Sequence, residues 1–326
     1  MKITLREGIR KVLFDEMSAN KDMIMIGESM YYTGSLFSKV INEDFFRTFG
    51  KERVLDCPVA EDAIIGMSFG AALAGMTAVP EIWCSDFLFC VANEINNTMT
   101  KWRYQHRYEA PINLVIRTPM GLFAAGGGGP EHAQCTEAWF HNTPGLVIIA
   151  PSSVRDAMGL LRSALKCGNP VLFMEHRQVY DVVEDVQTDE VFEEPISKAR
   201  IVREGKDVTI VAWSLMQLRA QQAADILAKK GVSAEVIDPR TIKPMDIDTI
   251  LTSVKKTGAL IVAEETPKTG SIAGEIITNV VEAGLTAKMA RLTMPNIPYS
   301  YIPEYEASTV PSADEIAEQA LKLVKG

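Results

Sequence analysis

Short apolar runs recur along the first half of the chain, and each has the length of a strand buried on both faces of a parallel sheet. Between these runs, apolar residues recur at the spacing of helices that cover such a sheet. The expected strands cover residues 22–27, 54–55, 78–83, 112–117, 146–150 and 171–175, and the expected helices cover 4–20, 62–75, 86–104 and 153–166. Strands that alternate with helices predict an α/β fold with a mostly parallel sheet.

The pattern changes between residues 180 and 199, where the acidic stretch DVVEDVQTDEVFEEP has no long period, as is typical of a linker. A second α/β unit follows, with strands expected at 208–213, 234–237 and 259–263 and helices between and after them. A chain of 326 residues exceeds the usual size of a single core. We therefore expect two α/β domains, at 1–185 and 205–326, joined by a linker at 186–204.

The stretch 54–75 is the centre of the expected first domain. Pro58 cannot donate to a sheet, so the strand should end there and a helix should begin shortly after. Gly66, Gly70 and Ala74 lie on one face of this helix, where another backbone could come close. Its other positions are mostly apolar, so we expect the helix to be mostly buried.

Two carboxylates follow expected strands. Glu28 comes directly after the strand 22–27, and Glu61 stands at the turn between strand and helix. Ligands bind at the carboxyl ends of strands in open α/β sheets, which favours both as site residues. The alternatives are an exposed loop acid for Glu28 and, for Glu61, a carboxylate stabilised by the helix dipole.

Four consecutive glycines at 126–129 mark a mobile or tightly approached loop. The loop is neither a P-loop nor a GxGxxG turn, because neither Lys-Ser/Thr nor a helix follows it. It leads to His132, which is either a structural or a catalytic histidine. Phe87, on the expected helix 86–104, is either a core residue or one wall of a pocket for a flat ring.

Composition narrows the partners and the compartment. The net charge of −9 argues against nucleic acid or an anionic membrane as a partner. No apolar run reaches the roughly 20 residues that span a bilayer, and the first residues lack the apolar core of a signal peptide. The 5 cysteines form no zinc pattern and suggest mostly buried thiols in a reducing cytoplasm.

Several motifs together resemble one family over essentially the whole chain. It is the β-subunit of the thiamine-diphosphate-dependent, decarboxylating component of 2-oxo acid dehydrogenase complexes, of the pyruvate, branched-chain and acetoin type. The matching motifs are Gly27-Glu28; the Asp-x-Pro-x-x-Glu of Asp56, Pro58 and Glu61; His132-Ala133-Gln134 followed by Trp139 and 144–146; and the turns at 236–244 and 296–299. The family fold comprises a transketolase-like pyrimidine-binding domain and a transketolase C-terminal-type domain, the latter mainly for assembly.

The resemblance implies a role for each candidate residue. Glu61 would hydrogen-bond the pyrimidine ring of the cofactor, so that the ring can take the thiazolium proton. Phe87 would stack on the pyrimidine with Val59 near it, and Glu28 would lie close to the cofactor and the neighbouring subunit. His132 would face the reacting carbon, as a proton donor or a guide for the lipoyl group. The family's potassium site of backbone carbonyls would map to Leu114, Ala164, Cys167 and Asn169.

A missing motif implies a partner. Thiamine enzymes hold the diphosphate through Mg²⁺ bound by a Gly-Asp-Gly sequence, and this chain has none. The resemblance therefore implies an α-subunit that carries the Mg²⁺ half of the site in an α₂β₂ heterotetramer, and a lipoyl-bearing acyltransferase that accepts the acyl group.

Two other readings remain open at this point. The chain could be the C-terminal half of a split transketolase, which Gly-Pro-Glu-His at 129–132 favours and the turn at 239–244 disfavours. It could also be a non-catalytic, flavoprotein-type subunit, which would need no glutamate in a buried turn. Ala133 replaces the family's serine, and the four glycines replace a more varied loop, so the substrate is left undetermined.

Overall fold

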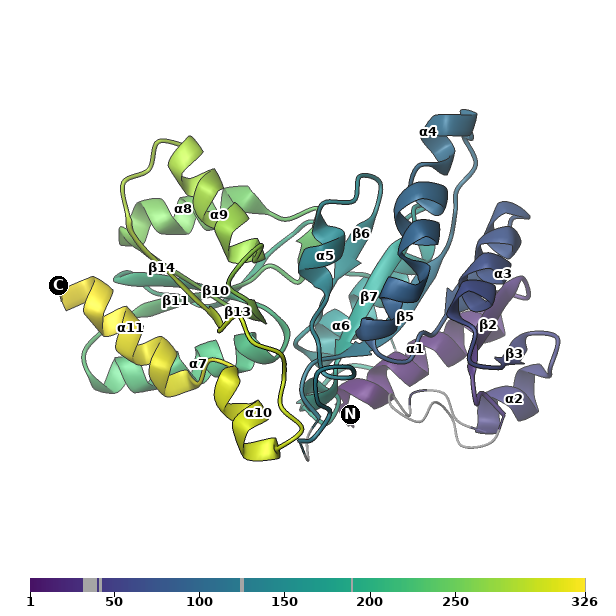
Figure 1. The fold of residues 1–326 in the computed structure, drawn as a ribbon, viewed down its shortest axis with the longest axis horizontal. Helices are drawn as coiled ribbons and strands as arrows, with labels where there is room; N and C mark the ends of the chain where they lie inside the picture. Colours follow the sequence, from purple (N-terminus) through teal and green to yellow (C-terminus); the bar gives the residue numbers. More distant parts are fainter. Residues whose placement is uncertain (32–39, 41–42, 124–125, 189, 326) are drawn as a thin grey trace. The chain divides into compact units, whose positions relative to one another are not determined.

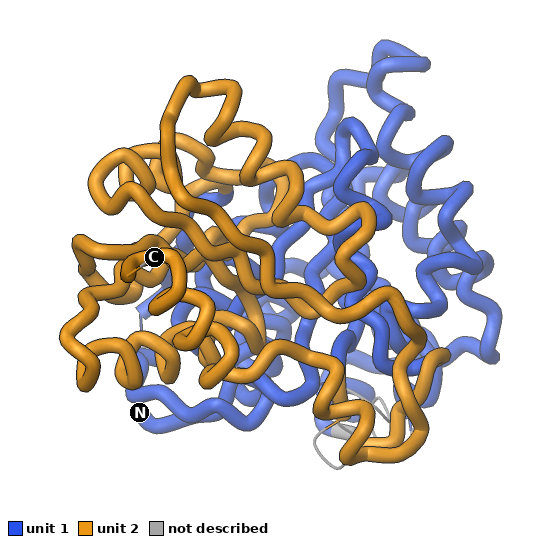
Figure 2. The backbone as a smooth tube through the Cα atoms, turned by 60° about the vertical axis from the view of Figure 1, so that its left-hand side comes forward, with its two compact units in different colours: residues 1–121, 132–196 blue, residues 122–131, 197–326 orange. Residues whose placement is uncertain are grey.

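The computed structural model describes residues 1–31, 40, 43–123, 126–188 and 190–325 (Figure 1). The chain divides into two compact units, shown in different colours in Figure 2. Unit 1 comprises Met1–Gly121 and His132–Ile196, and unit 2 comprises Leu122–Glu131 and Ser197–Gly326. The short segment Leu122–Glu131 thus groups with the second unit, although the chain on either side of it belongs to the first.

Unit 1 is built on parallel strands, as the continuous apolar runs predict. β2 (Met23–Glu28) lies between β3 (Val54–Cys57) and β4 (Thr77–Pro80), with both pairs parallel. β7 (Val171–His176) lies likewise between β5 (Val115–Met120) and β6 (Val147–Ile149). Parallel bridges from Ala78 to Leu114 and from Glu81 to Arg117 join β4 to the start of β5. The carboxyl ends of β2, β3 and β4 therefore lie at one edge of the sheet.

Helices of unit 1 begin where local side-chain bonds favour them. α1 (Leu5–Ala19) opens with a capping box between Thr4 and Glu7. α6 (Val154–Lys166) opens with the expected cap, in which the Asp156 N–H donates to Ser153 Oγ at 3.1 Å. The two helices pack together, and Gly8 permits their close approach. Smaller elements are α2 (Glu43–Phe49), α5 (Glu137–His141) and the antiparallel pair of β1 (Lys2–Thr4) and β8 (Val183–Asp185).

The prediction of a single long helix at 86–104 is wrong. The segment consists of a 3₁₀-helix η1 (Ser85–Val91), a π-helical turn η2 (Glu94–Met99) and a short α4 (Trp102–His106). These turns have different numbers of residues, so the α-helical spacing does not place side chains on one face. Val91 and Ile95 are buried, whereas Phe87 is half-buried and Cys90 is exposed.

The central helix is also less buried than its composition predicts. α3 (Glu61–Leu73) packs against β4 and η1 through one face. On the opposite side, a Cβ atom added to Gly66 or Gly70 would meet no atom of the other described residues within 4 Å, and the Met67 side chain is 45% exposed. An apolar sequence cannot distinguish a surface that meets the chain's own core from one that meets a partner. The expectation of mostly buried thiols fails similarly, since only Cys84 and Cys135 are buried among the five free cysteines.

Unit 2 is a second α/β layer with a mostly parallel sheet in the order β14-β13-β10-β11-β9. Only β9 runs antiparallel to its neighbour among these strands. The strands are β9 (Arg200–Arg203), β10 (Val208–Ala212), β11 (Ala234–Asp238), β13 (Ala259–Pro267) and β14 (Lys288–Met294), and the short β12 (Thr241–Lys243) lies outside this order. β9 falls within the stretch 186–204 that the sequence suggests as a linker, and the sequence pattern did not reveal β14.

Helices cover the sheet of unit 2. α7 (Ser214–Lys229) packs against β11 and against α11 (Ala313–Lys325), whose start has the expected capping box between Ser312 and Glu315. α8 (Ile247–Thr257) and α9 (Ile272–Glu282) pack against β10 and β13 respectively. The short α10 (Pro303–Thr309) precedes α11. In the part of the chain that the structure describes, no helix has the length and apolarity needed to cross a membrane.

Candidate active site

The carboxyl edge of the unit 1 sheet gathers the candidate residues of the first domain. Glu28 is the last residue of β2, and Glu61 follows β3 as the first residue of α3. Phe87 lies on η1, shortly after β4. Because β3, β2 and β4 are neighbouring parallel strands, the segments that follow them leave the sheet side by side.

Glu28 is a buried carboxylate on a fixed turn. Its side chain is 7% exposed, and the turn after it is held by Asp56, which accepts the Met30 N–H at 2.7 Å. Burial raises the pKa of Glu28 to about 6, with further contributions from the Glu61 and Glu81 carboxylates. The alternative of an exposed loop acid is therefore wrong for Glu28, and this carboxyl is partly protonated near neutral pH.

Glu28→Gln is expected to stabilise the chain at pH 7.5, because the ionised carboxylate is unfavourable where it is buried. The folded pKa of about 6 lies above the usual 4.5, so the folded state binds the proton more tightly than the unfolded state. Stability from this proton is present below pH 4.5 and is lost as the pH rises through 6. The shift corresponds to at most about 2 kcal/mol.

The measurement is the denaturant midpoint of both proteins at pH 4.5 and 7.5. The variant should unfold at a denaturant concentration only slightly higher than that of wild type at pH 4.5, and the difference should reach its full size at pH 7.5. Glu52→Gln, a change at an exposed glutamate, is the control. An advantage of the same size at both pH values would contradict the assignment of Glu28 as the titrating group.

Glu61 begins α3 without a side-chain cap from Ala60, so its carboxylate lies at the positive end of the helix dipole. The helix-dipole interpretation therefore fits, and it leaves a second role open, because Glu61 is half-buried and its charge acts on Glu28. Val59, two residues earlier, is 77% exposed. A carboxylate with an exposed apolar neighbour can hold a flat polar ring, and this structure presents both on one short turn.

Phe87 and His132 meet directly within unit 1. Their ring centroids are 5.4 Å apart and the planes are inclined at 77°, which is an edge-to-face contact. Both side chains are half-buried. The sequence separates them by a strand and the glycine loop, so only the fold brings these two candidates together.

Asp86 is a buried site residue that the sequence interpretation missed. Its Oδ1 accepts the Gln134 side-chain N–H at 2.8 Å, and the neighbouring Ser85 Oγ donates to the Gln134 carbonyl at 2.6 Å. Asp86 Oδ2 is buried and has no hydrogen-bond partner among the described residues, and burial raises the pKa of this carboxyl. These bonds hold the segment after His132 against the segment that carries Phe87. The available signal was a carboxylate next to Phe87 in an otherwise apolar run.

Comparison with known proteins places this chain in a family. The transketolase pyrimidine-binding domain matches residues 1–182, and the transketolase C-terminal domain matches residues 197–316. The chain is 38% identical over 326 residues to the mitochondrial pyruvate dehydrogenase E1 component subunit beta-2 of Oryza sativa subsp. japonica, covering 98% of this chain and 85% of that protein. It is 35% identical to the 2-oxoisovalerate dehydrogenase subunit beta of Bacillus subtilis, covering 98% of each.

The chain belongs to the E1 β-subunit family. A third relative of this family is the acetoin:2,6-dichlorophenolindophenol oxidoreductase subunit beta of Cupriavidus necator, 34% identical over 100% of this chain and 98% of that protein. Among solved structures, a split-gene transketolase described as an inactive β4 tetramer matches with a TM-score of 0.81 over 99% of both chains at 21% identity. That likeness supports the fold alone. The full-length E1 β relatives favour the dehydrogenase interpretation over the split transketolase.

This E1 β-subunit has a charged network buried in its sheet. Arg117 on β5 donates from Nη1 to Glu81 at 2.6 Å and, through Nε and Nη2, to both oxygens of Glu175 at 2.7 Å. The Tyr180 hydroxyl donates to Glu175 Oε2 at 2.7 Å. All four side chains are at most 1% exposed. Burial opposes the charge of Arg117, but Glu175 and Glu81 raise its pKa above the ordinary value.

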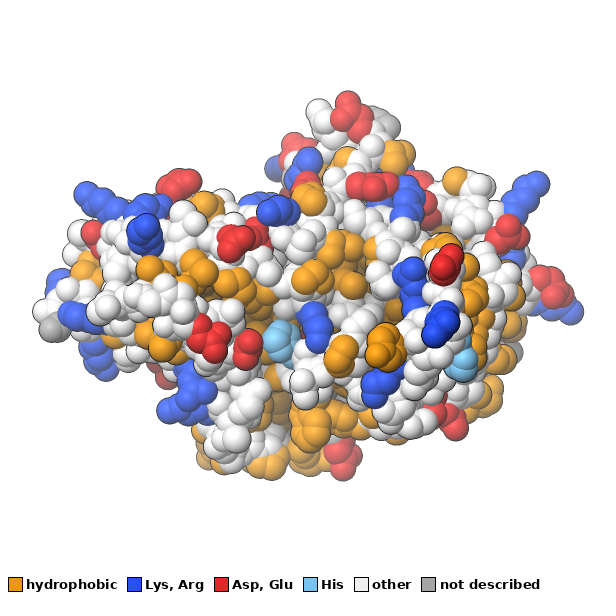
Figure 3. Space-filling view, turned by 90° about the horizontal axis from the view of Figure 1, so that it is seen from above, with side chains coloured by type: hydrophobic (Ala, Val, Ile, Leu, Met, Phe, Trp, Pro, Cys, Tyr) orange, Lys and Arg blue, Asp and Glu red, His pale blue; other side chains and the backbone are white. Residues whose placement is uncertain are grey.

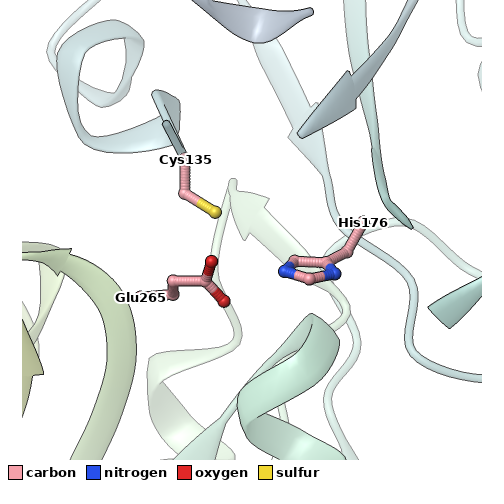
Figure 4. A group of neighbouring side chains, drawn as sticks. All are labelled: Cys135, His176 and Glu265. Atoms are coloured by element: carbon pink, nitrogen blue, oxygen red, sulfur yellow. The ribbon is translucent and has the colours of Figure 1, made fainter. Parts of the chain in front are cut away.

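Two more buried groups of unit 1 lie close to each other. The Cys135 thiol and a His176 ring nitrogen, both of unit 1, lie within 4.8 Å (Figure 4). Gly121 has φ +74°, and a side chain there would collide with the His176 ring. Arg177 Nη1 donates to the Gly121 carbonyl at 2.7 Å and so fixes the turn that follows β5. Glu265, also drawn in Figure 4, belongs to unit 2.

The carbonyls suggested for potassium lie around the end of α6 and the start of β7. Leu114 O accepts the Val171 N–H at 2.9 Å, and Ala164 O accepts the Cys167 N–H at 3.4 Å. The Cys167 thiol donates to Asn169 O at 3.4 Å, and the Asn169 amide donates to Cys167 O at 3.5 Å. Carbonyl oxygens have two lone pairs, so these bonds leave capacity for a cation.

Hydrophobic side chains reach the surface of this subunit at several places. Figure 3 shows them interspersed with charged side chains on one face. In unit 1, Met67 on α3, Phe89 on η1 and Trp139 on α5 are 45%, 38% and 72% exposed. Phe89 and Trp139 touch with ring centroids 5.1 Å apart. Of these side chains, the touching pair Phe89 and Trp139 forms a contiguous exposed apolar surface.

Proposed function

We propose that this chain is the β-subunit of a thiamine-diphosphate-dependent dehydrogenase. With its partner it would cleave a C–C bond next to a carbonyl and pass the acyl group to a lipoyl carrier. The observation that carries the proposal is the pair of interacting carboxylates, Glu28 and Glu61, at the same sheet edge as the Phe87–His132 contact. Substrates of the 2-oxo acid and acyloin classes correspond to the names of the relatives.

The side chains at this edge fit the aminopyrimidine ring of the cofactor. Phe87 offers an aromatic face, Val59 an exposed apolar side chain, and Glu61 a carboxyl group that can bond a ring nitrogen. When bound, thiamine diphosphate supplies a nucleophilic carbon that attacks the substrate carbonyl. Glu61 would hold a proton at the pyrimidine nitrogen and so make the amino group basic. Glu28, partly protonated near pH 6, would exchange protons beside it.

His132 would act at the reacting end of the site. Phe87 orients its imidazole, and the bonds of Ser85 and Asp86 to Gln134 restrict the chain that follows it. A histidine placed in this way can donate a proton to the developing product or guide the lipoyl group. We assign it the acyl-transfer part of the cycle.

An α-subunit would complete the site. The sequence has no Gly-Asp-Gly for a Mg²⁺ ion that binds the diphosphate, so we infer that the partner carries that half in an α₂β₂ heterotetramer. The open face of α3 at Gly66 and Gly70, together with exposed Met67 and Trp139, supports assembly with further subunits. We further propose that the carbonyls of Leu114, Ala164, Cys167 and Asn169 bind K⁺, because such oxygens are hard ligands.

The split site has a direct test. The chain alone is expected to bind thiamine diphosphate with Mg²⁺ poorly, because the diphosphate would have no anchor. Calorimetry at micromolar protein should give little heat for the isolated chain and a clear binding isotherm after the matching α-subunit is added. Tight Mg²⁺-dependent binding by the chain alone would contradict the proposal of a shared site.

A further inference from the structure

The glycine-rich loop is held by a buried carboxylate of unit 2. Glu306 on α10 is 0% exposed, and its Oε2 accepts the Gly127 N–H at 2.7 Å while its Oε1 accepts the Gly129 N–H at 3.1 Å. Both oxygens therefore accept hydrogen bonds from the loop backbone, from two N–H groups that are two residues apart. At the start of the segment, the Leu122 N–H donates to Glu265 at 3.1 Å.

The glycines are needed for this contact. Gly126 and Gly129 both have φ +70°, a conformation that disfavours residues with side chains. A Cβ atom on Gly126 would lie 2.4 Å from Pro303 Cβ, and one on Gly129 would lie 2.3 Å from the Tyr301 ring. The loop is thus tightly approached by the first residue of α10 and by the segment before it, which favours the second of the two interpretations of the glycine run.

The held loop limits where His132 can lie. His132 comes three residues after Gly129, and three residues span at most about 11 Å. An anchor at the Gly129 N–H therefore restricts the chain that leads to His132. The bonds from Ser85 and Asp86 to Gln134 restrict the chain that leaves it. Loss of the first anchor would let the short segment from Gly129 to His132 take up other backbone conformations.

We propose that Glu306 is a positioning residue that acts through His132. The second domain would then serve the catalytic cycle as well as assembly, since its carboxylate fixes the loop that leads into the site. The inference rests on the acyl-transfer role proposed for His132. Glu306 lies 177 residues from Gly129 in sequence, and no motif marks it.

The test uses Glu306→Gln in the complex reconstituted with the α-subunit. Glutamine has the shape of glutamate but only one accepting oxygen, so one of the two loop bonds is lost. Glu304→Gln, at an exposed carboxylate on the same helix, is the matched control, and Glu306→Asp tests rescue by a shorter carboxylate. The assays are reduction of an artificial electron acceptor and reductive acylation of a lipoyl domain. Their substrate is whichever of pyruvate, 2-oxoisovalerate and acetoin wild type uses fastest.

We expect Glu306→Gln to slow lipoyl acylation about tenfold, the usual order for loss of one bond to a charged group, and to change acceptor reduction less than about twofold. Glu306→Asp should recover part of the loss. Hydrogen exchange of residues 126–131 should accelerate in Glu306→Gln and stay unchanged in Glu304→Gln. In the His132→Ala background, Glu306→Gln should cause no further loss of acylation.

Three results would overturn the inference. The first is unchanged hydrogen exchange of residues 126–131 in Glu306→Gln. The second is an equal loss of lipoyl acylation and acceptor reduction in that variant, with a lowered melting temperature. The third is a further tenfold loss of acylation when Glu306→Gln is added to His132→Ala. The failure of the proposed function looks different. In that case His132→Ala itself would leave lipoyl acylation at the wild-type rate, and the role of Glu306 would fall with it.

Discussion

Glu61→Gln is expected to fold and assemble normally, but its turnover should fall by a factor of about 10²–10⁴, the usual contribution of one positioned acid–base group. Glutamine has the size of glutamate and can still hydrogen-bond a ring nitrogen, but it cannot release or take up the proton. The change should also keep α3 intact, because Glu61 is the first residue of the helix and the loss of one carboxylate at a helix N-terminus costs only a fraction of a kcal/mol. Turnover of the complex with the α-subunit is the measurement.

Asp62→Asn is the matched control for this loss. Asp62 is the next residue on α3, is exposed, and accepts the Ala63 N–H at 3.0 Å. This variant removes a carboxylate that interacts with the helix dipole but has no proposed role in catalysis. The dipole interaction alone stabilises the helix by only a fraction of a kcal/mol. Near-normal turnover of Glu61→Gln, or equal losses in the two variants, would show that Glu61 has only the helix-dipole role.

The second large effect is on stability. Arg117→Leu is expected to lower the free energy of unfolding by about 3–5 kcal/mol, the usual result of removing one partner from a buried ion pair. Glu81 and Glu175 would then remain in the sheet at 0–1% exposure without their shared cation. Chemical denaturation at pH 7 is the measurement.

The dependence of this loss on pH has a definite sign. Burial already raises the pKa of Glu175, and removal of Arg117 removes the group that opposes this rise. The folded variant should therefore bind protons more tightly than the unfolded chain, so its deficit should shrink as the pH falls from 7 towards 5. Lys166→Leu, which breaks the exposed pair with Glu193, is the control and should cost under about 1 kcal/mol. A deficit for Arg117→Leu as small as the control's would contradict a structural role for the network.

The sequence by itself determined the architecture of each unit. Continuous apolar runs predicted β2, β5, β6 and β7, because strands buried on both faces have no polar side to show. Short-range cues such as the cap at Ser153 and the capping box at Ser312 gave helix starts to within a residue. The motifs around Glu28, Glu61 and His132 identified the family, since they depend on residue types at fixed spacing.

Helical spacing could not show how residues 85–106 wind or which face of α3 stays open. In the first case the number of residues per turn changes within the segment. In the second the sequence records that positions are apolar, not what covers them. Both errors arise because periodicity is a local property, whereas burial depends on everything that packs around an element.

Only the tertiary structure decided which groups act on one another. The contact of Phe87 with His132, the bond from Gln134 to Asp86 and the cation shared by Glu81 and Glu175 join separate strands and loops. The sequence shows the glycine loop as a run of residues without side chains, but it does not show why glycine is needed there. Its N–H groups needed an acceptor, and the chain supplies one from Glu306, more than 170 residues away. A backbone donor carries no sequence signal for its partner, so such a bond can be found only where the fold brings the two together.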